Sequence, residues 1–223
     1  MNEEFKRPLS LVEATMNGIR SAIIGGNLSF GQILTESYLQ KTFGFSKTPI
    51  REALAQLKAE GIVVSEVHKG YKVFKMDEKE LSEFCEFRLA LESQALRSAY
   101  KNNRLELARV LKDFIKDFKE SIKVNDFKKY NLIDTKFHKS FFILSSNRYL
   151  TKNYENISGI IETIRTHTSP VIVDNYKLID SINGHISIHI HIKEKNLNLA
   201  LEELDKHINS WHDFRIIKSL LIS

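Results

Sequence analysis

The stretch of sequence that decides the fold is Ser46-Lys47-Thr48-Pro49-Ile50-Arg51-Glu52-Ala53-Leu54. Ser46 can cap a helix, because its hydroxyl can accept a hydrogen bond from a backbone N–H of the first turn. Pro49 is tolerated near a helix start, where its missing N–H is not required. Lys47, Thr48 and Arg51 are therefore expected on the first exposed turn, at the positive end of the helix dipole. Two cations and a hydroxyl in that place favour contact with phosphates and base edges, although solvated charges on an exposed helix would give the same short pattern.

The sequence around this helix predicts two more helices before it and a hairpin after it. Apolar residues recur at helical spacing over Leu9–Ile24, and Thr35 can cap a short helix that ends at Phe43. The third helix is expected to run to Glu60 and to end at Gly61. The segment Ile62–Phe74 is rich in β-branched residues, and Lys69-Gly70 interrupts it, as in a β-hairpin. Three helices followed by a hairpin are typical of a winged helix-turn-helix.

The rest of the chain favours helix throughout. Expected breaks between helices fall at Asn102-Asn103, Asn125-Asp126, Asn147 and Pro170, and the closing helix is expected over Leu197–Leu221. These breaks give about six helices, which is typical of an antiparallel bundle. The sequence therefore predicts a mainly α protein, with a winged helix-turn-helix over residues 1–75 and an all-helical domain over residues 76–223.

Composition restricts the class of protein. The 223 residues include 33 basic and 28 acidic side chains, a net charge of +5. Residues 1–75 hold 10 basic and 7 acidic residues, so they carry +3 of this charge, a mild sign of nucleic-acid binding. The single cysteine, Cys85, excludes an internal disulfide and fits a reducing compartment. No signal-peptide pattern or long apolar run is present, so a cytoplasmic protein that does not interact with membranes is expected.

Four residues in the helical part form a candidate metal site. Asp134 and His138 are four positions apart, so they project from one face of one helix. His185 and His207 fall on the last two helices, and antiparallel packing could bring them opposite that pair. Three imidazoles and a carboxylate suit zinc, nickel or manganese. Structural histidines at helix surfaces are the simpler alternative, since a chain with eight histidines produces such a pair by chance.

The N-terminal part resembles the GntR family of bacterial transcription regulators. The matching residues are Ile19 to Gly25, Thr35-Glu36, Leu39, Gly44-Phe45-Ser46, Thr48-Pro49, Arg51-Glu52-Ala53-Leu54, Leu57, Glu60-Gly61-Ile62 and Lys69-Gly70. The resemblance implies that Lys47 and Arg51 contact bases or phosphates, with Ser46 and Thr48 beside them. Lys69 and Gly70, at the tip of the wing, are expected to reach the neighbouring DNA backbone. Many members of the family carry arginine at the positions of Ser37 and Lys47. These two differences leave open which DNA sequence is bound.

The C-terminal part is similar to the FCD domain, the ligand-binding domain of the FadR-type branch of that family. The matching pieces are Arg88-Leu-Ala-Leu-Glu92, Asp134-Thr-Lys-Phe-His138, and His185 with His207-Ile208 further along. The resemblance assigns metal ligation to Asp134, His138, His185 and His207. Gly184 departs from it, because an acidic residue usually precedes the third ligand, and His189 is an extra histidine that could compete as a ligand.

Other residues of the helical part have a functional and a structural interpretation. By its resemblance, Arg88 is expected to bind a carboxylate effector; the alternative is a weak ion pair with Glu92, four positions later on an exposed helix. Cys85 is expected to be a small buried side chain. Trp211 could pack beside the metal pocket or belong to the core. The remaining aromatic residues are expected in the core: Phe114, Phe118, Phe127, Phe137, Phe141 and Phe142.

Together these features predict a homodimeric regulator that binds double-stranded operator DNA. A small organic acid at or near a divalent metal ion would shift the population between two arrangements of the DNA-binding heads. Two alternatives stay open at this point. One is a metal-dependent hydrolase. The sequence shows no obvious general base beside the ligands, which argues against it. The other is a repressor with a structural metal and no effector.

Overall fold

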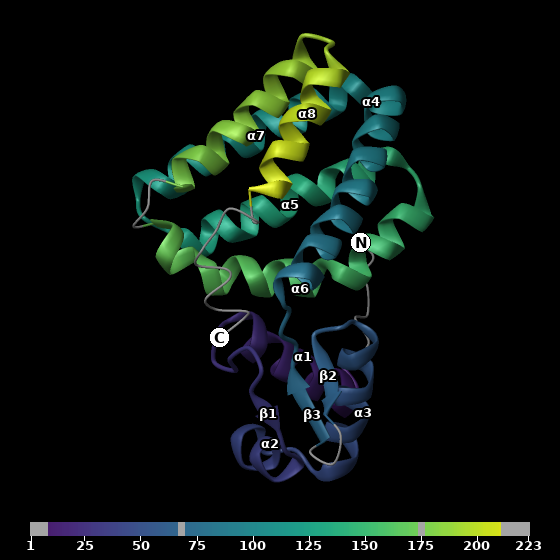
Figure 1. Cartoon of the computed structure of the whole chain (residues 1–223), viewed down its shortest axis with the longest axis vertical. Helices are drawn as coiled ribbons and strands as arrows, with labels where there is room; N and C mark the ends of the chain where they lie inside the picture. The colour runs from purple at the N-terminus through teal and green to yellow at the C-terminus, as the bar shows by residue number, and fades with distance from the viewer. Residues whose placement is uncertain (1–8, 67–69, 174–176, 211–223) are drawn as a thin grey trace, which may run out of the picture. The chain divides into compact units, whose positions relative to one another are not determined.

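In the computed structural model, the chain divides into two compact units, residues 1–75 and residues 76–223 (Figure 1). The structure describes residues 9–66, 70–173 and 177–210. Lys69 and Trp211, to which the sequence assigned a wing contact and a packing role, lie outside the described residues.

The N-terminal unit begins with three helices, α1 (Leu11–Ile24), α2 (Glu36–Phe43) and α3 (Lys47–Ala59). The Ser10 hydroxyl and the Glu13 carboxylate cap α1 reciprocally, which satisfies two backbone donors at its start. All three predicted helices are confirmed, to within two residues at their ends.

A small sheet completes this unit. Strands β2 (Val63–Glu66) and β3 (Gly70–Val73) pair antiparallel, which confirms the predicted hairpin. Strand β1 (Ile33–Leu34) adds to the other edge of β3, so the sheet order is β1-β3-β2. Sequence analysis missed β1 because two residues cannot show an alternating pattern. Gly70 has φ +89°, a conformation that favours glycine where the wing turns into β3.

The C-terminal unit is helical over its described residues. Its elements are α4 (Glu78–Lys123), α5 (Phe127–Ser145), α6 (Arg148–Val173), α7 (Lys177–Lys193) and α8 (Leu197–Asn209). Helix α4 packs against α5, α7 and α8, and α7 packs along α8 (Figure 1). The mainly α fold class, with a winged helix-turn-helix and a helical bundle, is confirmed.

The structure confirms one of the predicted helix breaks and contradicts another. At Asn102-Asn103 the helix is interrupted, because Asn103 has non-helical φ −144° and ψ 40°, so α4 consists of two helical segments joined by a kink. The side chains of Asn102 and Asn103 donate to backbone carbonyls of Ser145 and Leu144 at the end of α5. Helix α6 runs through Pro170 and ends at Val173, so the predicted break at Pro170 is wrong.

The core of the helical unit is aromatic at its centre. Phe118, Phe137, Phe141 and Phe142 are fully buried, as predicted, while Phe114 and Phe127 are only partly buried. Cys85 is buried too, and burial raises the pKa of its thiol to about 11, in keeping with a packing role. Among the described residues, no helix is both long enough and apolar enough to span a membrane.

Candidate metal centre and nucleic-acid interface

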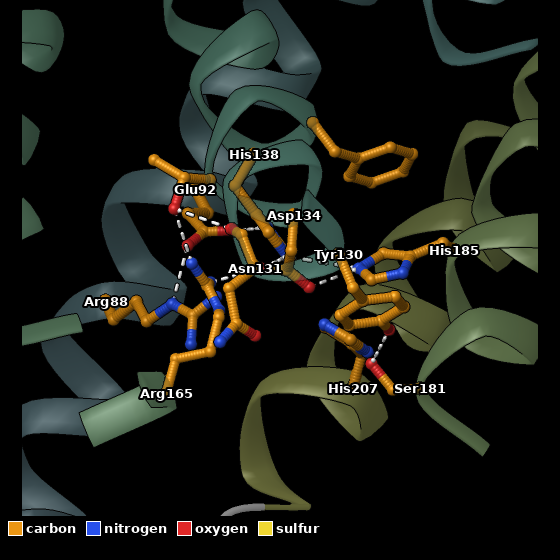
Figure 2. Close-up of polar contacts among 12 residues, drawn as sticks. Arg88, Glu92, Tyr130, Asn131, Asp134, His138, Arg165, Ser181, His185 and His207 are labelled. Carbon is orange, nitrogen blue, oxygen red and sulfur yellow. Dashed lines mark hydrogen bonds and ion pairs between the residues drawn. The ribbon is translucent and has the colours of Figure 1, made fainter. Parts of the chain in front are cut away.

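Four side chains from three helices converge inside the helical unit. Asp134 and His138 come from adjacent turns of α5, His185 from α7 and His207 from α8. One potential ligand atom from each lies within 4.8 Å of the others (Figure 2). The structure therefore brings together all four residues that the sequence singled out. His189, the possible competitor one turn further along α7, is not in this group.

The spacing of the donor atoms fits one ion. His185 Nε2 lies 3.3 Å from Asp134 Oδ1 and 3.4 Å from His138 Nε2, and His138 Nε2 lies 3.8 Å from Asp134 Oδ2. Ligand atoms placed about 2.1 Å from a common ion lie about 3 to 4 Å from one another. Three imidazoles and one carboxylate are a donor set for a borderline divalent ion. Asp134, His138 and His185 are buried, which limits competition from water.

Two further charged residues, Glu92 and Arg165, contact members of this group of four. Glu92 Oε2 lies 2.6 Å from His138 Nδ1, which leaves His138 Nε2 directed at the other donors. Arg165 of α6 forms an ion pair with Asp134 and donates to the Thr135 hydroxyl at 2.7 Å. Neither residue was predicted as part of the centre. Glu92 could have been found from its spacing to Arg88, but nothing in the sequence points to Arg165.

The charge state of the centre suits metal ligation. Burial would raise the pKa of Asp134, but Arg165, His185 and His138 hold it well below its usual value. Burial lowers the pKa of His185, and Asp134 offsets only part of that effect. Burial and the neighbouring histidines lower the pKa of His207 far more. The aspartate is thus ionised and both imidazoles are neutral near pH 7, as metal binding requires.

Aromatic packing fixes the orientation of one of the imidazoles. The His185 ring stacks on Phe118, with centroids 4.7 Å apart and an interplanar angle of 6°, and Phe137 lies 4.5 Å from the same ring. The aromatic residues that the sequence assigned to the core therefore also hold His185 in place.

Arg88 forms the ion pair with Glu92 that sequence analysis gave as the alternative to effector binding, but the pair is buried and not on an exposed helix. Its Nε lies 2.6 Å from Glu92 Oε1, and the exposed fractions of the two side chains are 1% and 0%. The alternative of an ion pair on an exposed helix is therefore wrong about the environment. Breaking a pair in this setting costs far more than breaking a surface pair, because it leaves a buried charge without compensation. The effector-binding role of Arg88 stays a prediction.

The exposed start of α3 carries the predicted DNA-contacting residues. Ser46, Lys47, Thr48 and Arg51 are all exposed, while Pro49 is buried behind them. Arg51 forms an ion pair with Glu36 at the start of α2, and this contact raises the pKa of Arg51. The expected cap by Ser46 is wrong, because Ser46 occupies the N-cap position without a capping hydrogen bond from its side chain.

Comparison with known proteins matches both units. Residues 11–73 match the family described as bacterial regulatory proteins, gntR family, and residues 83–210 match the FCD domain. Proteins of these families are transcriptional regulators and not enzymes, so the hydrolase alternative is excluded.

Similar proteins of known name or structure agree with these matches. The chain is 28% identical over 193 residues to the gluconate operon transcriptional repressor of Bacillus licheniformis, covering 86% of this chain and 79% of that protein. It is 26% identical over 200 residues to the repressor of the same name from Bacillus subtilis (strain 168), covering 87% and 81%. The solved structure of E. coli McbR/YncC superimposes with a TM-score of 0.75 at 18% identity, covering 95% of this chain and 99% of that one, which shows the shared fold.

Proposed function

We propose that this chain, which belongs to the GntR family of bacterial regulatory proteins and carries an FCD domain, is a repressor controlled by a divalent ion and a small carboxylate. It is a DNA-binding transcriptional regulator of the GntR/FCD type. The observation that supports metal control is the convergence of Asp134, His138, His185 and His207 on one point.

Four donors would leave coordination positions open on an ion that prefers six ligands. When bound, a divalent ion would supply positive charge and open coordination positions to an anion. Asp134, His138, His185 and His207 would hold it through one atom each. Since structural zinc sites are closed by four protein ligands, an ion that prefers six ligands would better suit effector control.

Charge balance favours an anionic effector. Without an ion, the buried charges of Arg88 and Arg165 balance those of Glu92 and Asp134. A divalent ion would add two positive charges to this buried group, and uncompensated charge in a low-dielectric interior is costly. A carboxylate would offset one of these two charges and occupy open coordination positions at the same time. Two similar proteins are gluconate operon repressors, so gluconate is the first carboxylate to test.

Control of DNA binding would operate by population shift. Two copies of the chain would present two α3 helices to half-sites about one helical turn apart. A carboxylate that binds one arrangement of the dimer more tightly would favour that arrangement and its spacing of the helices. Lys47 and Arg51 would contact the DNA, and the binding affinity would fall steeply as the salt concentration rises. The protein would act in the cytoplasm, where this DNA is.

The test is DNA binding by the full chain under defined metal occupancy. A binding sequence is selected from a random DNA pool, and its affinity is measured for metal-loaded protein, chelator-treated protein and each of these with gluconate. We expect a carboxylate to change the affinity at least tenfold, and only in the metal-loaded protein. A large effect of the chelator on thermal stability, with no response to gluconate or to a panel of other carboxylates, would instead favour the effector-independent repressor with a structural metal.

A further inference from the structure

The carboxylate of Glu92 contacts both Arg88, the predicted effector-binding residue, and His138, a proposed metal ligand. Glu92 Oε1 accepts from Arg88 Nε at 2.6 Å, and Glu92 Oε2 lies 2.6 Å from His138 Nδ1. Figure 2 shows the three side chains in one continuous series of contacts. Each oxygen thus serves a different partner, one from α4 and one from α5.

The surroundings hold this carboxylate in place. The exposed fraction of the Glu92 side chain is 0%, and each of its oxygens has a partner, Arg88 for one and His138 for the other. Arg88 and Glu92 lie one turn apart on α4, and the adjacent Cys85, Ala95 and Leu96 are fully buried. A carboxylate with both oxygens engaged cannot turn towards one partner without releasing the other.

The contact with His138 acts on the metal-facing side of the imidazole. A carboxylate at Nδ1 holds the proton there, which leaves the Nε2 lone pair for the ion and makes it a stronger donor. Removal of a supporting contact of this kind typically lowers metal affinity about 10- to 100-fold.

We infer that Glu92 is a positioning residue that joins Arg88, the predicted carboxylate-binding residue, to His138, the proposed metal ligand, so that a change at either one alters the other. This inference rests on the proposed function. By linkage, an effector that draws Arg88 away from Glu92 would leave the carboxylate to His138 and strengthen metal binding, and bound metal would favour the effector equally.

Cobalt binding tests the inference without DNA or an effector. The full chain, freed of metal by chelator, is titrated with Co²⁺ and its visible absorption is recorded, because the spectrum reports ligand number and geometry. Glu92→Gln should lower Co²⁺ affinity about 10- to 100-fold and alter the spectrum. Arg88→Met should retain or raise the affinity, because it leaves Glu92 to His138 alone. Glu106→Gln, which removes an exposed partner of Arg109 on the same helix, is the matched control and should change neither.

A third variant separates misfolding from loss of positioning. Glu92→Gln deprives buried Arg88 of its counter-charge, so the double variant Arg88→Met/Glu92→Gln removes both charges at once. It should fold, as judged by circular dichroism, and still bind Co²⁺ at least tenfold more weakly than Arg88→Met alone.

The outcomes distinguish this inference from the proposed function. Wild-type protein that binds no Co²⁺ in a manner dependent on His185 would overturn both. Wild-type binding that Glu92→Gln leaves unchanged in affinity and spectrum, or that Arg88→Met and Glu92→Gln weaken equally, would overturn the role of Glu92 alone.

Discussion

The start of α3 and the centre of the helical unit both collect charged side chains, but in opposite environments. Lys47 and Arg51 lie in water, where charge costs little and can be used to bind a polyanion. Arg88, Glu92 and Asp134 are buried, where each charge requires a partner. Substitutions at the first region should therefore affect binding and spare stability, whereas those at the second should affect both.

The largest effect is expected for Asp134→Asn. This change removes the charge that balances Arg165 and one of the four proposed metal ligands. We expect the free energy of unfolding to fall by about 3 to 5 kcal/mol, measured by chemical denaturation of metal-free protein. Asp113→Asn, which removes an exposed partner of Arg109, is the control and should cost less than about 0.5 kcal/mol. Equal denaturation midpoints for Asp134→Asn and Asp113→Asn would contradict the difference in stability that we expect between buried and exposed charges.

Arg51→Ala should separate binding from stability in the other direction. The exposed fraction of the Arg51 side chain is 65%, so its loss should change the free energy of unfolding by less than about 0.5 kcal/mol. Loss of the contact between Arg51 and a base or phosphate should weaken binding to the selected DNA by about 1 to 3 kcal/mol, which is at least about fivefold in affinity. An anisotropy titration measures this change. Lys58→Ala, at the far end of the same helix, is the control. DNA affinity within twofold of wild type would show that α3 is not the recognition helix.

Gly184→Ala should cause a smaller change at the metal centre. A Cβ at position 184 would lie 3.1 Å from His207 Nδ1, so the imidazole would have to shift by a few tenths of an ångström. We expect metal affinity to fall about three- to tenfold, or about 1 kcal/mol, by calorimetric titration with Zn²⁺. Gly18→Ala, on α1, places its Cβ 3.6 Å from Phe43 and should leave metal affinity unchanged. An unchanged affinity for both variants would show that His207 has room to adjust.

The smallest effect is the response of metal-free protein to mild acid. The pKa values of His185 and His207 are lowered in the folded state, so below pH 6.5 the unfolded chain binds protons that the folded chain does not. This contribution to stability is therefore fully present only well above pH 6.5, and it falls as the pH drops towards and through that value. Between pH 7.5 and 6.5 the two residues together should cost about 0.7 kcal/mol in free energy of unfolding. A double variant with glutamine at both positions should lose this part of the pH dependence, and an identical pH profile would contradict the assignment.

The two regions also differ in how far the sequence predicts them. The proposed DNA-contacting turn depends on local signals, since Pro49 and the exposed cations lie within one helix, and sequence analysis placed that helix correctly. The capping role of Ser46 was wrong, because residue type permits a cap but does not require the hydroxyl to turn towards the backbone.

Sequence analysis predicted which four residues meet in the buried centre and missed the residues that support them. The spacing of Asp134 and His138 fixes their shared face, whereas His185 and His207 were placed by the expected antiparallel packing of the last two helices and by the resemblance to the FCD domain. The ion pair between Asp134 and Arg165 depends on how α6 packs on α5, which no pattern within either helix determines. Burial of Arg88 with Glu92 likewise depends on the helices that cover α4.

The most direct test of the metal centre is anomalous X-ray diffraction from crystals of the full chain grown with Zn²⁺, Ni²⁺ or Mn²⁺. The account predicts one strong anomalous peak per chain, within about 2.3 Å of a donor atom from each of Asp134, His138, His185 and His207. It also predicts that Glu92 stays hydrogen-bonded to His138 beside that peak. Well-ordered electron density for the four side chains with no anomalous peak among them, or with the peak elsewhere, would contradict it.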